Sequence, residues 1–420
     1  MRFVRWASIA YLSRPLEGTS DGSETAMAGA ESPHSSPSLD NRFSKDVEKV
    51  AETVFRSEAT NVLHALTKPV GTYYVRCNTI KISSEELERR LQARGLEIIR
   101  NTLIPEALGI RIDGQYEVPG TGQDVVVDKQ TAESVLQGAN VYAPGIMNCM
   151  SMEIGDQVTI VSELGEIIAS GKALMNANEV LTFRKGLAVQ INQRRFGSPH
   201  IRELPEFSEG LLYPQSLAAM TTVRVLNPKP GETIADMNCA PGGKLSHICQ
   251  LTGNSGKVLG FDRNVSKVAQ ARQNMVRLAC ANVVLSIHDS RYLHDDFTDL
   301  EVDRVLIDPP CSALGLRPKV YDFTSSKRIR DLADYQKQFV KAASEITKPG
   351  GVIVYSVCTF TMEECEQVVD FAERECSLRV TGQTPFLGST GLDVGQSGSR
   401  CQRFHPHTHE IGYFIARFER

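Results

Sequence analysis

The first part of the chain combines apolar residues at helical spacing with short apolar runs typical of strands. From Phe43 onward, valines and leucines recur at helical intervals, which predicts helices. Residues 72–76 predict a strand, residues 84–94 a helix that begins at a serine cap, and residues 109–112 a second strand. Residues 41–118 are therefore expected to form a small α+β unit.

From Asp124 the apolar runs become short and closely spaced, with glycine turns between them. A helix is expected at residues 129–136, followed by a turn-rich segment that contains Gly138 and Tyr142. The expected strands lie at 125–127, 157–161, 166–174 and 187–191. This spacing predicts a compact β-barrel over residues 119–200.

Residues 201–420 alternate buried strands with amphipathic helices, and an aspartate stands at the end of four successive strands. These aspartates are Asp236, Asp262, Asp289 and Asp308. A glycine-rich turn follows the first strand and brings backbone amides close to a ligand. An acid after the second strand can accept hydrogen bonds from a ribose diol. Because the turn lacks the GxGxxG pattern, the segment predicts a Rossmann-like fold that binds S-adenosylmethionine rather than a nicotinamide dinucleotide.

The candidate cofactor-binding residues follow from this pattern. They are Asn238, Cys239, Ala240, Pro241, Gly242, Gly243, Lys244, Asp262, Asp289 and Asp308.

Two further strands each end in a turn that carries a cysteine. Cys311 follows the strand at 305–307, and Cys358 follows the strand at 352–355. If these strands are neighbours, both thiols line the crevice at the carboxyl ends of the sheet. A lone cysteine is more often a small buried hydrophobe, but two at equivalent strand ends indicate a reactive pair.

Composition narrows the class of protein. The net charge is −4, so any contact with nucleic acid must use local patches such as Arg184-Lys185 and Arg194-Arg195. The ten cysteines include no CxxC pair, and the histidines at 405, 407 and 409 have no acidic or cysteine partners of ligand spacing, so no metal is expected. No apolar run is long enough to span a membrane. Separately, we expect the protein to be a monomer.

Residues 1–40 are rich in serine, glycine, alanine and proline and predict a disordered leader. Because residues 1–14 contain arginine and no acid, they are also compatible with a mitochondrial transit peptide. A cytoplasmic location is the expectation, with mitochondria as the alternative.

The motifs NCAPGGK, DPPCS and SVCT, together with Asp262 and Asp289, resemble the NSUN (Nop2/Sun) family of RNA cytosine-5 methyltransferases over about residues 43–420. The family forms are CAAPGGK, DAPCS followed by glycine, and STCT. This chain departs from them at Asn238, Cys239, Pro309, Ala313 and Val357, none of which must react. The segments GANVYAPGI and GDQVTIV resemble a PUA domain, a module that binds RNA. The barrel places the chain with the PUA-bearing branch of the family.

The resemblance implies a role for each site residue. Cys358 is the nucleophile that adds to carbon 6 of cytosine, and Cys311 assists loss of the carbon 5 proton and release of the enzyme. Asp308 bonds the base, and Lys244 reaches the cytosine or the cofactor. It further implies tRNA as the substrate, methylated in the acceptor stem near the CCA end, which the PUA domain grips. Candidate RNA contacts are Tyr142, Arg184, Lys185, Arg194 and Arg195.

Two other functions stay open at this point. In amino-group methyltransferases that carry a DPP motif, an aromatic residue follows the prolines, whereas this chain has Cys311 there. A catalytically silent RNA-binding or ribosome-assembly protein could keep the same fold. The presence of both cysteines counts against it, because a silent protein needs neither.

Overall fold

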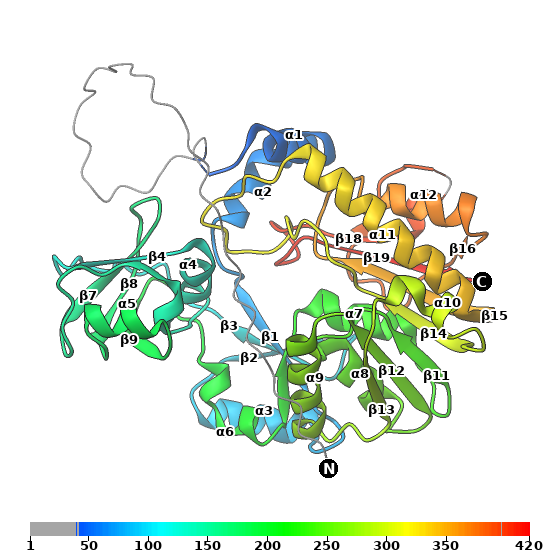
Figure 1. The fold of residues 1–420 in the computed structure, drawn as a ribbon, viewed down its shortest axis with the longest axis horizontal. Helices are drawn as coiled ribbons and strands as arrows, with labels where there is room; N and C mark the ends of the chain where they lie inside the picture. Colours follow the sequence, from blue (N-terminus) through cyan, green and yellow to red (C-terminus); the bar gives the residue numbers. More distant parts are fainter. Residues whose placement is uncertain (1–38, 40–41, 396) are drawn as a thin grey trace, which may run out of the picture.

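The computed structural model describes residues 39, 42–395 and 397–420, and within these residues the strands form sheets of four, six and nine strands. The barrel lies at one end of the molecule and the nine-stranded sheet at the other (Figure 1). The leader and transit peptide expected from the sequence fall on residues outside the described part.

The first unit is an α+β region whose sheet has the order β10-β1-β3-β2. Its elements are α1 (Lys45–Phe55), η2 (Arg56–Glu58), α2 (Ala59–Leu66), β1 (Thr72–Cys77), α3 (Ser84–Ala93), β2 (Ile98–Arg100), β3 (Ala107–Arg111), η4 (Ile201–Glu203), α6 (Pro205–Ser208) and β10 (Leu212–Pro214). Because β10 follows the barrel in the chain yet pairs with β1, the barrel is an insertion into this unit.

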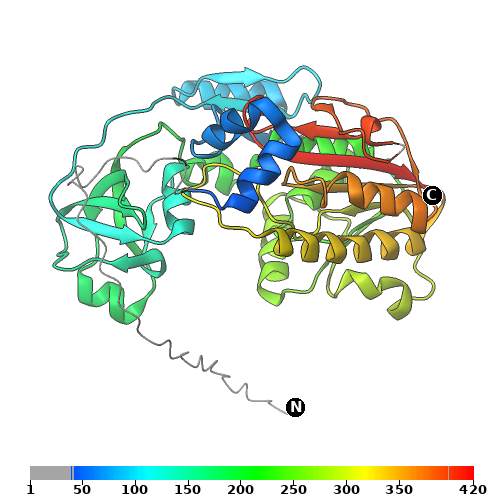
Figure 2. The ribbon, with the colours of Figure 1, turned by 90° about the horizontal axis from the view of Figure 1, so that it is seen from above.

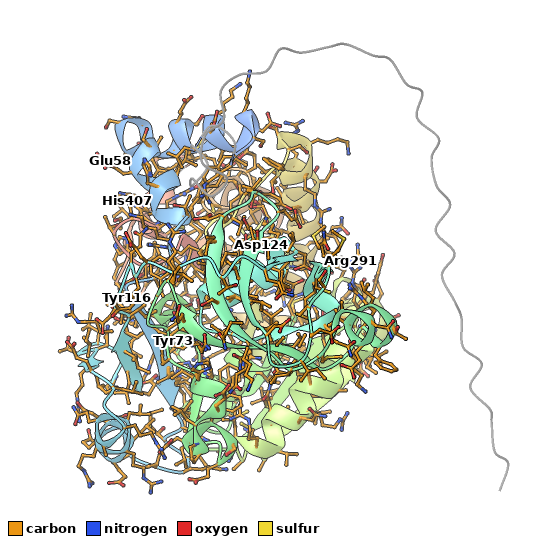
Figure 3. The ribbon with its side chains drawn as sticks, turned by 90° about the vertical axis from the view of Figure 1, so that its left-hand side faces the viewer. Glu58, Tyr73, Tyr116, Asp124, Arg291 and His407 are labelled. Carbon is orange, nitrogen blue, oxygen red and sulfur yellow. The ribbon has the colours of Figure 1, made fainter. Side chains whose placement is uncertain are left out.

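The barrel has a six-stranded sheet of order β5-β9-β8-β7-β4-β6, in which β4 and β7 are parallel. It faces the viewer in Figure 3, where Asp124 is labelled. Its elements are β4 (Asp124–Val127), α4 (Lys129–Leu136), β5 (Val141–Tyr142), η3 (Ala143–Gly145), β6 (Ile146–Asn148), β7 (Gln157–Ser162), β8 (Ile167–Ala173), α5 (Ala177–Phe183) and β9 (Leu187–Arg194). The core is largely aliphatic, and β7 and β8 are buried along almost their whole length.

The nine-stranded sheet has the order β13-β12-β11-β14-β15-β19-β18-β17, with β16 beside β19. Strands β13 to β15 are parallel, and β19 runs antiparallel to β15. Its elements are α7 (Leu217–Leu226), β11 (Thr233–Asp236), α8 (Gly243–Leu251), β12 (Lys257–Asp262), α9 (Val265–Arg277), β13 (Val283–Ile287), η5 (Ser290–Tyr292), α10 (Leu293–Asp296), β14 (Val302–Ile307), α11 (Ser326–Ile346), β15 (Thr347–Val357), α12 (Glu366–Glu375), β16 (Arg379–Val380), β17 (Ser389–Thr390), η6 (Gly398–Arg400), β18 (Gln402–Phe404) and β19 (Tyr413–Glu419).

Helices cover both faces of this sheet, so its parallel strands are almost continuously apolar. Val305 packs with α11 and α12 on one face, and Leu306, the next residue, packs with α7 and α8 on the other. In Figure 2, α11 and α12 lie together on one side of the strands. The strand order reverses between β11 and β14, which is where the crevice of such a sheet binds ligands.

One loop from the region of the nine-stranded sheet reaches the barrel. Val320, on the loop between β14 and α11, is 1% exposed and packs inside the apolar core of the barrel. Its backbone N–H donates to Glu133 of α4 at 3.0 Å, and the Tyr321 hydroxyl donates to Glu163 at 2.6 Å. This loop is the yellow segment that passes between α2 and α4 in Figure 1. It fixes the barrel against the rest of the molecule.

Candidate active site

The two cysteines predicted from the strand ends lie side by side. Strands β14 and β15 are parallel neighbours, with Ile307 opposite Tyr355. The turns that follow them place the Sγ atoms of Cys311 and Cys358 3.2 Å apart. The expectation that the strands are neighbours is therefore confirmed, and the two sulfur atoms are in direct contact.

The shared hydrogen bond differentiates the two sulfurs. The bond to Cys358, and then burial, raise the pKa of the Cys311 thiol well above its ordinary value. Two thiols this close retain at least one proton, because two adjacent thiolates would repel each other. The arrangement therefore favours Cys311 as the sulfur that keeps a proton.

Asp308 and Lys244 form an ion pair next to the thiols. The Lys244 ammonium donates to Asp308 Oδ2 at 2.5 Å and lies 5.7 Å from the ring centre of Tyr413. Burial lowers the pKa of Lys244, but Asp308 and Tyr413 outweigh it, and the net shift is upward. Lys244 is therefore a fixed positive charge at the reacting end of the crevice.

Two residues to which the motifs assigned no role, Ser356 and Tyr413, hold Asp308 from behind. The Ser356 hydroxyl donates to Asp308 Oδ1 at 3.0 Å, and the Tyr413 hydroxyl donates to Ser356 Oγ at 3.1 Å. Ser356 begins the SVCT motif, two residues before Cys358, so its place in the motif was the available signal. These bonds fix the carboxylate, whose other oxygen bonds Lys244.

A cavity of about 360 Å³ runs from the ends of β11 and β12 to the two cysteines. Of the predicted cofactor-binding residues, Asn238, Ala240, Asp262, Asp289 and Asp308 line it, and Cys311 and Cys358 close one end. Buried Asn238 Oδ1 has no hydrogen-bond partner among the described residues, so an acceptor is left for a ligand.

The glycine-rich turn has the backbone that the pattern predicts. Gly242 has φ +103°, a backbone conformation that residues with a side chain rarely adopt, so the turn favours glycine there. Cys239 is buried in the core below the turn, and Pro241 is exposed with its carbonyl bonded to Asn274. Gly243 accepts a hydrogen bond from the buried Arg76 guanidinium through its carbonyl. The cavity therefore fits an adenosyl cofactor in its size, its acids and its close backbone.

Asp289 and Asp262, the two acids at the far end of the cavity, already accept hydrogen bonds from neighbouring residues. Asp289 accepts hydrogen bonds from Arg291, and that bond lowers the pKa of Asp289. Asp262 accepts the Asn264 N–H at 2.8 Å through Oδ1. Both carboxylates still line the cavity, where they can accept hydrogen bonds from a diol.

The predicted RNA contacts on the barrel divide into two groups. Arg184 donates to the backbone carbonyls of Ile146 and Pro144, each at 2.7 Å. Arg195 pairs with the carboxylate of Glu166, which also pairs with Arg42. These two arginines hold the barrel together and anchor it.

The other predicted RNA contacts are less occupied by bonds within the protein. Arg194 is half-buried and bonded to the Ser198 carbonyl, whereas Lys185 is exposed and Tyr142 is 55% exposed. Tyr142 and Gly138 line a cavity of about 430 Å³ between the barrel and the first unit. Whether these residues contact RNA stays a prediction.

The histidine-rich loop before β19 packs on the first unit and is not among the residues that line the cavity. The rings of His405 and Phe55 are 5.2 Å apart, and His407 is labelled next to Glu58 in Figure 3. Among the described residues no group of three His, Cys, Asp or Glu side chains is placed to hold a metal. In the same part of the chain, no helix has the length and apolar character that a membrane span requires.

Comparisons with known proteins agree with this geometry. Residues 223–419 match the family model of the 16S rRNA methyltransferase RsmB/F, and residues 123–194 match the PUA domain. A tRNA (cytosine(72)-C(5))-methyltransferase of Pyrococcus horikoshii is 37% identical over 388 residues, covering 90% of this chain and 97% of the relative. A mouse tRNA (cytosine(72)-C(5))-methyltransferase, NSUN6, is 28% identical over 77% of this chain and 74% of its own length.

A solved structure is similar over nearly the whole chain. The crystal structure of NSun6 from Pyrococcus horikoshii with SFG superimposes with a TM-score of 0.83 at 37% identity, covering 90% of this chain and 98% of that one. The match includes the inserted barrel as well as the nine-stranded sheet, because both lie within the aligned length. The chain belongs to the NSUN (Nop2/Sun) family of S-adenosylmethionine-dependent RNA cytosine-5 methyltransferases.

Proposed function

We propose that this chain methylates carbon 5 of a cytosine in the acceptor stem of tRNA, near the CCA end. The relatives that match most of the chain are named for cytosine 72 of tRNA, and we assign the same position here. The observation that carries the proposal is the pair of sulfurs 3.2 Å apart, at the end of a cofactor-sized cavity and next to the Lys244–Asp308 ion pair.

Carbon 5 of cytosine is not nucleophilic enough to take a methyl group by itself. When the Cys358 thiolate bonds to carbon 6, the ring electrons shift toward carbon 5, which then becomes an enamine-like nucleophile. A thiol suits this step better than a hydroxyl, because a thiol ionises near neutral pH. When bound, S-adenosylmethionine supplies the electrophilic methyl group that carbon 5 receives.

Asp308 and Lys244 stabilise the ring while the covalent bond forms. The Asp308 carboxylate can accept hydrogen bonds from the N3–H and N4 amino group of a protonated cytosine, which draws electrons away from carbon 6. Since Ser356 and Lys244 already hold this carboxylate, it needs no reorganisation during the reaction. This fixed orientation favours the charged ring over the neutral one.

The sulfur pair also explains how the product leaves. In the free enzyme, the hydrogen bond with Cys358, and then burial, help to keep the proton on Cys311. Once Cys358 is bonded to carbon 6, its sulfur is a weaker hydrogen-bond partner, so Cys311 loses that stabilisation and can release its proton to solvent. The Cys311 thiolate then removes the carbon 5 proton. The electron pair of that C–H bond reforms the ring double bond and expels Cys358 as a thiolate.

The proposal is tested with purified protein, a tRNA transcript and methyl-labelled S-adenosylmethionine. We expect label at one acceptor-stem cytosine, mapped by bisulfite sequencing. Cys358→Ala should abolish transfer. Cys311→Ala should accumulate a covalent RNA adduct, visible as a slow band on a denaturing gel.

Cys376→Ser is the matched control, because Cys376 is half-buried at the edge of the apolar core and does not line the cavity. This variant should retain wild-type activity. Full activity in Cys358→Ala would refute the assignment of the nucleophile. Absence of label in the wild type across total tRNA would instead favour a silent RNA-binding protein.

A further inference from the structure

A fully buried carboxylate lies behind the two cysteine turns. Glu364 precedes α12 and is 0% exposed. Its Oε1 accepts the Ser312 N–H at 2.8 Å and the Gln336 amide at 2.9 Å. Its Oε2 accepts the Ser312 hydroxyl at 2.5 Å and the Thr361 hydroxyl at 3.0 Å. Four donors therefore converge on one side chain.

These bonds reach both cysteine turns. Ser312 is the residue after Cys311, and its hydroxyl lies 2.8 Å from that of Thr359, the residue after Cys358. On the other side of Cys311, the Pro310 carbonyl accepts a hydrogen bond from Gln336 at 3.0 Å. The turn that carries Cys311 is thus held on both sides by groups that Glu364 bonds directly.

The chemistry of the site calls for a group that only accepts hydrogen bonds. Each of these four donors to Glu364 is neutral, so none of the four bonds supplies a positive charge to offset the burial of a carboxylate. An amide at this position would direct its own N–H groups at hydroxyls and at the Gln336 amide. By contrast, Glu366, two residues later, is buried in a bidentate pair with Arg403. Glu364 is therefore the buried acid of this segment that serves the cysteine turns.

We propose that Glu364 is a positioning residue for product release, which holds the turn of Cys311 so that its sulfur stays within reach of the carbon 5 proton. This role rests on the proposed function, because it acts through Cys311. The predicted consequence is selective. Two of the four bonds of Glu364 come from Ser312 in the turn of Cys311, whereas the residue next to Cys358 is reached only through the contact between Ser312 and Thr359. Release needs Cys311 in place, whereas addition of Cys358 to the ring does not. Loss of the carboxylate should therefore slow release more than addition.

The charge of Glu364 acts in the same direction. After the bond to Cys358, burial and the charge of Cys358, the carboxylate of Glu364 contributes to the raised pKa of Cys311. This contribution persists after Cys358 has bonded to the base, and a thiolate whose thiol has a higher pKa is the stronger base toward the carbon 5 proton. The bonds of Glu364 to the turn of Cys311 assign it to the second half of the reaction, and its charge acts on the same sulfur.

The test compares adduct formation with turnover in Glu364→Gln, which keeps the shape but replaces an acceptor with a donor. We expect turnover to fall roughly ten- to a hundredfold, the equivalent of one or two lost hydrogen bonds to a charged group. The rate of adduct formation should change by less than about threefold. A covalent RNA band should accumulate, as in Cys311→Ala, while the KM for S-adenosylmethionine stays at the wild-type value.

Glu363→Gln is the matched control, since it alters the adjacent carboxylate outside this network, and it should show wild-type turnover and no band. Ser312→Ala removes one of the four bonds and should give the same pattern at about a tenfold loss. It is the measurement to use if Glu364→Gln does not fold.

Equal losses of adduct formation and turnover in Glu364→Gln would overturn the proposal, since they indicate general damage to the site. Unchanged turnover would overturn it as well. If Cys311→Ala traps an adduct and Glu364→Gln does not, only the role of Glu364 fails. If Cys311→Ala itself traps none, the release chemistry of the proposed function fails instead.

Discussion

Asp236 is a buried acid beneath the cofactor turn, and replacing it with asparagine should stabilise the protein at alkaline pH. It ends β11, is 1% exposed, and its Oδ2 has no hydrogen-bond partner among the described residues. Its Oδ1 accepts the Asn238 N–H at 3.3 Å. Burial, and then the charge of Asp308, raise the pKa of Asp236 from 3.8 to about 7.

The sign and size of the effect follow from this pKa. The folded protein holds the proton of Asp236 up to about pH 7, whereas the unfolded chain loses it near pH 3.8. Stability from this group therefore falls as the pH rises between these values and is constant above. At about 1.4 kcal/mol for each pKa unit, the full loss is about 4 kcal/mol. Asparagine cannot ionise and keeps the acceptor for Asn238, but burying its amide hydrogens costs about 1–3 kcal/mol.

The variant Asp236→Asn is therefore expected to exceed the wild type by about 1–3 kcal/mol above pH 7 and to lose this advantage near pH 4. Thermal denaturation followed by circular dichroism between pH 4 and pH 8.5 measures the difference, at about 2–4 °C for each kcal/mol in a domain of this size. Asp299→Asn, at an exposed aspartate, is the control and should show no such pH dependence. A difference between Asp236→Asn and wild type that stays constant over this range, or a loss of stability at pH 8, would refute the reasoning.

Three further outcomes are expected. Arg403→Met leaves Glu366 buried and unpaired, so the free energy of unfolding should fall by about 3–5 kcal/mol in urea denaturation. Val320→Ala removes buried methyl groups from the barrel core and should cost about 2 kcal/mol in the same assay. Lys244→Met removes the partner of Asp308 and should lower the rate of methyl transfer roughly a hundredfold or more in the labelling assay.

Each of these three predictions has a result that would contradict it. Wild-type stability of Arg403→Met would mean that Glu366 is protonated or reached by water. No loss in Val320→Ala would mean that the barrel core closes without this side chain. Methyl transfer by Lys244→Met at the wild-type rate would remove Lys244 from the mechanism, while a loss of stability alone would assign it a structural role.

The backbone of the glycine-rich turn and the meeting of the two thiols were predictable because their signals are local. A strand followed by NCAPGGK determines the turn of Gly242, and the positions of Cys311 and Cys358 at two strand ends predict that they meet if the strands are neighbours. The inference needed only strand polarity, which the sequence pattern provides.

The rest depended on contacts between residues far apart in the chain. Arg184 and Arg195 looked like free basic pairs, yet their partners are the Ile146 carbonyl and Glu166, which no local pattern links to them. Glu364 lies in an acidic run that is typical of an exposed helix face, and only the fold shows that it is buried. The leader, the location in the cell and the monomeric state stay predictions.

The position of Val320 limits how the barrel and residues 201–420 can be separated into fragments. The side chain of Val320 packs in the core of the barrel, whereas its backbone belongs to residues 201–420. Separating the two parts would therefore expose apolar surface on both. A fragment limited to residues 201–420 would present Val320 to water, and an excised barrel would be left with a hole. Exchanging the barrel for one from a distant relative should therefore succeed only if the donor offers a socket of matching shape.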